Sequence, residues 1–266
     1  MRIKKIAALI AGVALTFSIA ACSGSKAPAN AEKAQGADFT VGFDAEFPPY
    51  GFQESGKYVG FDLELAQEVA QRNGWNFKPQ PIAWDSKDME LNSGNIDCIW
   101  NGFTIDGRED AYTWSEPYVD NKIVFVTGAA SKITSATDLK GKSVLVQADS
   151  SGLRALKSDA NKDLVASFKQ LTEVPDYNNG LMELESGAAD AMAVDQSVGQ
   201  YQINLRGKDK FNVFDPGFPG EKYGIGFKKG NTALRDQVQK TLDEMKKDGT
   251  LEKIAEKWGQ QDVVIR

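Results

Sequence analysis

Residues 97–118, DCIWNGFTIDGREDAYTWSEPY, run from an apolar segment into a polar loop, and this change of character predicts both a fold class and a site. Cys98, Ile99 and Trp100 are typical of a buried strand. Asn101 and Gly102 then break the apolar run at a point where backbone groups can face a ligand. In open α/β sheets small molecules bind beyond the carboxyl ends of the strands. We therefore expect a binding site where this strand ends.

Two side chains in this loop have the chemistry to hold a carboxylate. Thr104 offers a hydroxyl, and Arg108 offers a planar fork of donors that matches a carboxylate group. The alternative is that Arg108 is a solvated loop charge paired with Glu109 or Asp110, as most arginines on a surface are. Residue types alone leave both interpretations open.

The segments on either side alternate between strand and helix patterns. Residues 39–43 alternate as a strand, residues 61–73 have an apolar face at helical spacing that ends at Asn73-Gly74, and residues 75–84 predict a second strand before the one at Cys98. This order is typical of a parallel sheet with right-handed crossovers. Cys98 itself is expected to be a small core residue.

A second α/β unit follows the strand-like run KIVFVT at 122–127. It contains strands at 143–147 and 189–194, and the chain returns through the turn-rich residues 215–220 to a strand at 223–227 and two closing helices. We predict a two-lobed α/β protein whose lobes are mixed, mostly parallel sheets flanked by helices and joined by hinge strands. The expected boundaries are 38–127 and 220–266 for the first lobe and 128–219 for the second. Ligand sites favour such inter-domain clefts.

Three further positions at strand ends have more than one reading. The turn around Ser150 and Ser151 offers backbone amides that suit an anion, or it caps the next helix with Asp149 or Ser150 and binds nothing. Asp195 ends a buried strand and either binds an ammonium group or caps a helix. Phe47, held by two prolines, is either a wall for an apolar part of a ligand or a lid on the core.

Composition excludes several classes of function. The chain of 266 residues has no histidine, so a Ser-His-Asp triad or a histidine-liganded zinc site is not possible. Its two cysteines, Cys22 and Cys98, fit neither a disulfide framework nor a thiolate metal cluster. A net charge of −6 argues against a nucleic-acid partner, which needs a basic face. We expect no cofactor and no metal.

The amino terminus is typical of an export signal. Residues 1–21 have a basic start, a short apolar run and a small-residue end. The ending Ile19-Ala20-Ala21-Cys22 resembles the bacterial lipobox, which implies a lipid on Cys22 that tethers the chain to the outer face of the cell membrane. The alternative is an ordinary signal peptide cut near Ala21. Residues 22–37 are polar and small, and they predict a flexible tether.

From residue 39 to residue 260 the chain resembles the polar amino-acid-binding proteins of ABC transporters. The motifs that carry the resemblance recur in order over nearly all of the mature chain: VGFDAEFPPYGF, YVGFDLELAQEVA, WNGFTIDGRE with WSEPY, DLKGKSVLVQADSS, GAADAMAVDQ, and KYGIGFKKGN closing on KWG. They are specific for the family and weakly specific for the ligand. The resemblance implies a monomeric, extracytoplasmic receptor that hands a free amino acid to membrane permease subunits.

The same resemblance implies roles for particular residues. Arg108 corresponds to the arginine that holds the α-carboxylate, helped by Thr104 and by donors at Ser150 and Ser151. Asp195 corresponds to the residue that takes the α-ammonium, with Thr104 and the Gly102 carbonyl. Further ligand contacts are implied for the aromatic pair Phe47 and Trp84, for Asp44 and Gln147 at the polar end of the ligand, and for Asn101 and Phe103 beside Gly102. The spacing departs from the family at one place, because Arg108 follows Thr104 by four residues where five are expected.

Two other functions remain open at this point. Some relatives on this scaffold resemble cyclohexadienyl dehydratases, and here Glu46, near Asp44, is the candidate general acid. A sensor or adhesive surface protein that uses the same cleft as a switch is the third possibility.

Overall fold

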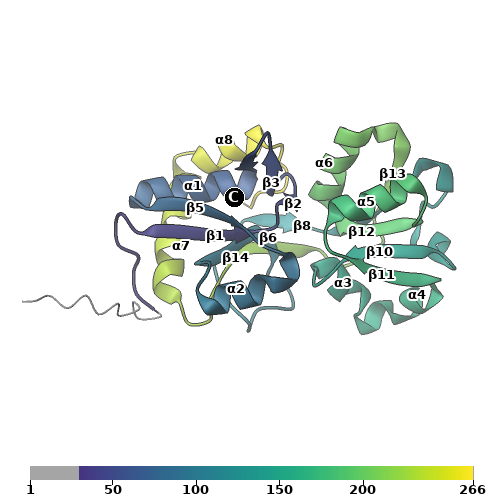
Figure 1. Ribbon diagram of the computed structural model, residues 1–266, viewed down its shortest axis with the longest axis horizontal. Helices are drawn as coiled ribbons and strands as arrows, with labels where there is room; N and C mark the ends of the chain where they lie inside the picture. Colours follow the sequence, from purple (N-terminus) through teal and green to yellow (C-terminus); the bar gives the residue numbers. More distant parts are fainter. Residues whose placement is uncertain (1–29, 266) are drawn as a thin grey trace, which may run out of the picture.

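The computed structural model describes residues 30–265. The predicted signal peptide, the lipidation site Cys22 and the first part of the predicted tether lie outside these residues. The described chain folds into two α/β lobes, which Figure 1 shows side by side and linked by strands. None of the helices within residues 30–265 has the length and apolar character needed to cross a membrane.

The first lobe contains a mixed six-stranded sheet. Its strands are β1 (Asp38–Phe43), β5 (Asn76–Pro81), β6 (Cys98–Thr104), β7 (Thr113–Trp114), β8 (Val119–Asn121) and β14 (Glu221–Phe227). They follow the order β5-β1-β6-β14-β7, with β8 also paired to β14. Strand β1 is parallel to β5 and β6, and β14 is antiparallel to β6. A small separate sheet consists of β2 (Glu46–Phe47), β3 (Gly51–Glu54) and β4 (Lys57–Val59).

The second lobe contains a mixed five-stranded sheet. Its strands are β9 (Ile123–Gly128), β10 (Ser143–Gln147), β11 (Gln170–Val174), β12 (Ala191–Asp195) and β13 (Phe211–Phe214), in the order β11-β10-β12-β9-β13. Strand β10 is parallel to β11 and β12, and β9 runs antiparallel to its neighbours β12 and β13.

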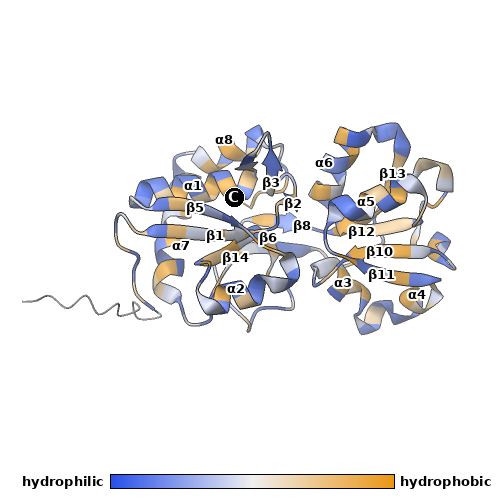
Figure 2. Ribbon diagram, in the orientation of Figure 1, coloured by the Kyte–Doolittle hydropathy of each residue, from blue (hydrophilic) through white to orange (hydrophobic). Residues whose placement is uncertain are grey.

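Helices cover both sheets. Those that accompany the first sheet are α1 (Phe61–Asn73), α2 (Lys87–Ser93), α7 (Thr232–Lys247) and α8 (Thr250–Lys257). Those of the second lobe are α3 (Ser151–Leu156), α4 (Lys162–Ser167), α5 (Tyr177–Ser186) and α6 (Gln196–Arg206). Figure 2 shows orange and blue residues mixed along the helices, as expected for helices that bury one face and expose the other. In α7 the predicted apolar face is buried, at Leu234, Val238, Leu242 and Met245.

The chain crosses between the lobes earlier than predicted. The KIVFVT run becomes β9, which lies between β12 and β13 in the second sheet, whereas β8 still pairs with β14 in the first. The crossing is therefore at Lys122, and the boundary expected at 127 is wrong for this strand. Strand propensity predicted the element but not the sheet in which it finds partners. The chain returns between β13 and β14.

Strand β6 also continues farther than predicted. The Asn101-Gly102 pair was expected to end it, yet the strand runs on to Thr104. Gly102 has a φ of +52°, and the pairing of β6 with β14 shifts register beside it, so the pair bends the strand without ending it. An added Cβ at Gly102 would lie 2.7 Å from the Phe47 ring and 2.9 Å from the Tyr223 ring. Glycine here lets both aromatic rings approach the strand.

Candidate functional site

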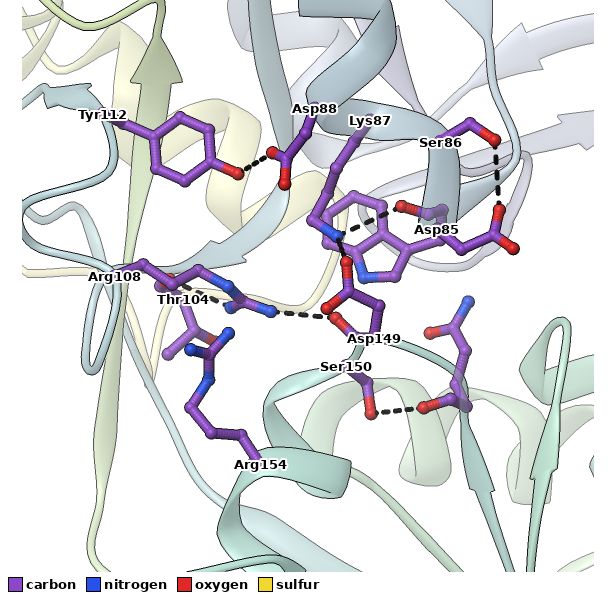
Figure 3. A network of polar contacts seen from close by, with 12 residues as sticks. Asp85, Ser86, Lys87, Asp88, Thr104, Arg108, Tyr112, Asp149, Ser150 and Arg154 are labelled. Carbon is purple, nitrogen blue, oxygen red and sulfur yellow. Dashed lines mark hydrogen bonds and ion pairs between the residues drawn. The ribbon is translucent and has the colours of Figure 1, made fainter.

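Arg108 lies buried where the two lobes meet. Its side chain follows the end of β6, and one nitrogen donates to the Thr104 carbonyl (3.2 Å) while another reaches across to the Asp149 carbonyl (2.9 Å) (Figure 3). The residue is only 7% exposed, and burial lowers the pKa of its guanidinium. The guanidinium also lies 5.0 Å from the centre of the Phe103 ring. The alternative of a solvated charge is therefore wrong, since neither Glu109 nor Asp110 pairs with it.

The short spacing before Arg108 is accommodated by a tight turn. The Arg108 amide donates to the Ile105 carbonyl (2.8 Å), and Gly107 takes a φ of +74°, in the region that glycine tolerates best. From the other lobe, Arg154 donates to the Gly107 carbonyl (2.9 Å). The four-residue loop thus directs the guanidinium to the boundary between the lobes.

Asp195 is the corresponding buried group of the second lobe. It is 3% exposed, and its two oxygens accept hydrogen bonds from Asn121 (2.7 Å), Tyr223 (2.5 Å) and Tyr177 (2.7 Å). Its side chain makes no capping hydrogen bond to α6, so the capping alternative is wrong. Burial raises the pKa of Asp195, and within residues 30–265 no lysine or arginine forms an ion pair with it. A buried carboxylate with neutral donors only is suited to an ammonium ion.

The two serines after β10 have different roles. Ser150 caps α3, because its hydroxyl accepts from the Leu153 amide (3.1 Å) and donates to the Gln147 carbonyl (2.8 Å). The capping alternative is thus correct for the side chain of Ser150. Ser151 instead donates across the lobe boundary to Glu221 (2.9 Å), and Thr104 donates to the same carboxylate oxygen (3.1 Å). The Thr104 hydroxyl, which was predicted to face a ligand, and the Ser151 hydroxyl, which was not, therefore meet at Glu221.

Asp44 and Gln147 also meet across the boundary. The Gln147 amide donates to Asp44 (2.7 Å), whose other oxygen accepts from the Glu46 backbone (2.9 Å). Burial raises the pKa of Asp44 to about 6. The Asp44 backbone amide donates to the side-chain oxygen of Asn101, which brings that predicted residue into the same group. Glu46, the candidate acid of the enzyme hypothesis, is an exposed residue. The pKa of its carboxyl is raised, first by the partial burial of that group and second by the negative charge of Asp176.

The two predicted aromatic walls lie in separate ring clusters. Phe47 packs against Tyr50 (5.7 Å between ring centres) and against Tyr177 of the other lobe (5.6 Å). Trp84 packs edge-on against Phe103 (5.4 Å). Among the ring contacts of the described residues none joins Phe47 to Trp84. Their predicted role as a sandwich for a ligand side chain stays a prediction.

Lys87 forms an inter-lobe contact that was not predicted. Its ammonium group donates to the Trp84 carbonyl (3.2 Å), lies 4.9 Å from the centre of the Trp84 ring and pairs with the Asp149 carboxylate of the second lobe (Figure 3). The Lys87 side chain is 1% exposed, and burial lowers its pKa. Asp149, at a φ of +52°, therefore receives both Lys87 on its carboxylate and Arg108 on its carbonyl. We call this group, Lys87, Asp149 and Arg108, the inter-lobe clasp.

Replacing Lys87 with methionine is expected to loosen the closed arrangement. Methionine fills a similar volume but cannot pair with Asp149, whose side chain stays half exposed and can be hydrated when the lysine is gone. The loss of a partly exposed pair is worth about 1 kcal/mol, which corresponds to about a fivefold weaker affinity for a ligand that needs closed lobes. Small-angle scattering of the ligand-free variant should give a larger radius of gyration. The exposed Lys78→Met is the control, and a Lys87→Met protein with unchanged radius and affinity would contradict a role in closure.

Four residues of the site besides Lys87 were missed because each depends on contacts between distant segments. Asn121 and Glu221 lie on the strands that connect the lobes, Tyr177 opens α5, and Tyr223 lies on β14. Tyr223 belongs to the KYGIGF motif that carries the family resemblance, but the motif does not predict its hydrogen bond to Asp195. A polar residue at either end of a connecting strand is the one local signal that marks Asn121 and Glu221.

Comparisons with known proteins identify the family of the chain. Residues 39–261 match the family described as bacterial extracellular solute-binding proteins, family 3. The L-cystine-binding protein TcyJ of Escherichia coli strain K12 is 32% identical over 227 residues, which cover 84% of this chain and 83% of TcyJ.

Two solved structures show the same architecture. A substrate-binding protein of an ABC uptake transporter from Streptococcus pneumoniae with bound histidine has a TM-score of 0.82 and 34% identity, over 86% of this chain and 95% of that one. The ancestral amino-acid-binding protein AncCDT-1, described as a precursor of cyclohexadienyl dehydratase, has a TM-score of 0.75 and 31% identity, over 84% and 95%.

Proposed function

Because the chain belongs to the bacterial extracellular solute-binding proteins of family 3, we propose that it captures a free amino acid between its lobes and delivers it to the permease of an ABC importer. One observation carries the proposal. Arg108 of the first lobe and Asp195 of the second are both buried at the lobe boundary, and they do not pair with each other. A zwitterion supplies the missing counter-charge to each.

The proposed assignment follows the chemistry of each group. Arg108 binds the α-carboxylate, with Thr104 and the main chain at Ser150 and Ser151. Asp195 binds the α-ammonium with the Gly102 carbonyl. The side chain of the ligand lies against Phe47 and Trp84 and extends toward Asp44 and Gln147. The neighbouring backbone at Asn101 and Phe103 completes the contacts.

Capture requires a conformational change and no covalent chemistry. A ligand held by groups of both lobes makes its full set of contacts only when the lobes are closed, so it shifts the population toward the closed form. Release to the permease reverses this shift. The inter-lobe clasp adds to the closed form, and its Arg108 belongs also to the charge pair that we assign to the ligand.

A screen for ligands tests the proposal directly. The protein is heated with each of the twenty amino acids, cystine and ornithine, and a true ligand at 100 times its dissociation constant adds about 2.7 kcal/mol to the free energy of unfolding. We expect at least one large shift, followed by a calorimetric titration. No shift with any amino acid would contradict the proposal. Formation of product from prephenate or arogenate would favour the enzyme hypothesis instead.

We also propose that Cys22 carries a lipid that holds the mature chain on the outer face of the membrane. Cys22→Ser in the full chain, expressed in a bacterium that processes lipoproteins, should move the protein from the membrane fraction to the medium, because the acyl chains supply the membrane affinity. Ser25→Ala, three residues away, is the control and should stay with the membrane. Membrane association of the Cys22→Ser protein would contradict the lipid anchor.

A further inference from the structure

Glu221, the first residue of β14, gathers hydrogen bonds from three separate elements on one oxygen. Its Oε1 atom accepts from Thr104 of β6 (3.1 Å), from Asn121 of β8 (2.6 Å) and from Ser151 of α3 in the other lobe (2.9 Å). Its Oε2 atom accepts no hydrogen bond from residues 30–265, although Glu221 retains some exposure. The carboxylate is therefore fixed by one oxygen and free at the other.

A second carboxylate, that of Asp195, lies close to Glu221 and shares a donor with its Oε1 atom. The Asn121 amide nitrogen donates to Glu221 and also to Asp195, so one donor bridges two acids. Asp195 already accepts from Tyr177 and Tyr223 as well. Of the two acids, Glu221 is the one with an oxygen that accepts no hydrogen bond from the part of the chain that the structure describes.

The charges around the two acids do not balance. Burial and then the negative charge of Asp195 raise the pKa of Glu221 to about 7. The groups that face Glu221 are Asp195 on β12, the hydroxyls of Tyr177 on α5 and Tyr223 on β14, and the Arg108 guanidinium, which acts through space. Within residues 30–265 no lysine or arginine forms an ion pair with either acid. Two adjacent carboxylates without a cation are costly unless a bound ligand brings one.

We propose that Glu221 is a specificity-determining residue of the amino-acid site, whose free Oε2 accepts a hydrogen bond from the α-ammonium group of the ligand beside Asp195. This inference rests on the proposed function and adds a residue to it. The α-ammonium then meets two carboxylates, and the Asn121 amide and the Ser151 hydroxyl hold one of them, Glu221, in place. A ligand without the ammonium group leaves both acids uncompensated.

The arrangement makes binding depend on pH with a definite sign. An ammonium ion favours the ionised carboxylate, so it lowers the pKa of Glu221 in the complex below its ligand-free value of about 7. Below that pH the ligand-free carboxyl is protonated, and binding must release the proton. Affinity therefore falls as pH is lowered, by up to about tenfold per unit for one such group.

Glu221→Gln tests this role, because it removes the charge and leaves an oxygen to accept from Asn121, Thr104 and Ser151. The control is Glu116→Gln, which removes the same charge from an exposed residue of the same lobe. Each protein is titrated by calorimetry at pH 8 and pH 6 with the L-amino acid that gives the largest shift in the screen above, starting from L-histidine and L-cystine. Two buffers of different ionisation enthalpy count the protons released.

In the wild type and in Glu116→Gln we expect affinity to fall about tenfold from pH 8 to pH 6, with proton release at pH 6. Glu221→Gln should bind at least tenfold more weakly at pH 8 and release fewer protons at pH 6. Its ligand-free melting temperature at pH 8 should not fall, since the change removes a repulsion.

Unchanged affinity and proton release in Glu221→Gln would overturn this inference and leave the proposed function intact. Tighter binding by Glu221→Gln would also overturn it, because Glu221 would then compete with the ligand's carboxylate. A wild type that binds no amino acid would overturn both.

Discussion

Arg108→Ala is expected to abolish amino-acid binding, with a dissociation constant raised by about a hundredfold to several thousandfold. In the protein the guanidinium is fixed by the carbonyls of Thr104 and Asp149 and lies over Phe103, so it is held in place before a ligand arrives. Its loss leaves the α-carboxylate in a buried place without its cation, which costs about 3–5 kcal/mol. Calorimetry with the amino acid found in the screen measures the change.

The matched control for this variant is Arg154→Ala. Arg154 is a neighbouring but exposed arginine, and it also bridges the lobes through a hydrogen bond to the Gly107 carbonyl (2.9 Å). Its removal should weaken affinity by no more than about fivefold, since an exposed contact contributes about 1 kcal/mol or less. Equal losses in the two variants would mean that Arg108 acts as an inter-lobe contact and not as the carboxylate receptor. Retained affinity in Arg108→Ala would remove the assignment altogether.

The sequence predicted those features that depend on neighbours along the chain. The strand at Cys98, the α1 helix that ends at Gly74 and the burial of Cys98 all follow from local apolar patterns and turn residues. Arg108 was found because the loop that bears it directly follows a buried strand. The structure brings it to the lobe boundary, while its contact with a ligand stays a prediction.

Features that depend on how the lobes meet could not be read in the same way. Lys87 begins a helix and has the pattern of a solvated lysine, yet it is buried because Asp149 approaches from the other lobe. Glu221 follows a run of glycines and prolines, where a charge normally faces water, yet it receives hydroxyls from both lobes. The wrong boundary at 127 has the same origin, because β-propensity does not tell which sheet a strand joins.

Asp195→Asn is expected to raise the dissociation constant by a hundredfold or more while leaving the ligand-free fold intact. The affinity falls because a buried ammonium loses a counter-charge, which costs several kcal/mol, on the order of 3. The fold is retained because the asparagine has the same shape, and the Tyr177 hydroxyl can turn to accept from the new amide group. Calorimetry and thermal unfolding at pH 8 measure the two effects separately.

The thermal result decides between two roles for Asp195. As an ion it is buried among neutral donors, so its neutralisation should keep or raise the melting temperature of the ligand-free protein. Asp120→Asn is the control, because it removes an exposed carboxylate that pairs with Lys222 on the same pair of connecting strands, and it should change neither quantity by more than about 0.5 kcal/mol. A lower melting temperature with unchanged affinity would make Asp195 a structural anchor for Tyr177 and Tyr223. The ammonium group would then have to be held by Glu221 alone.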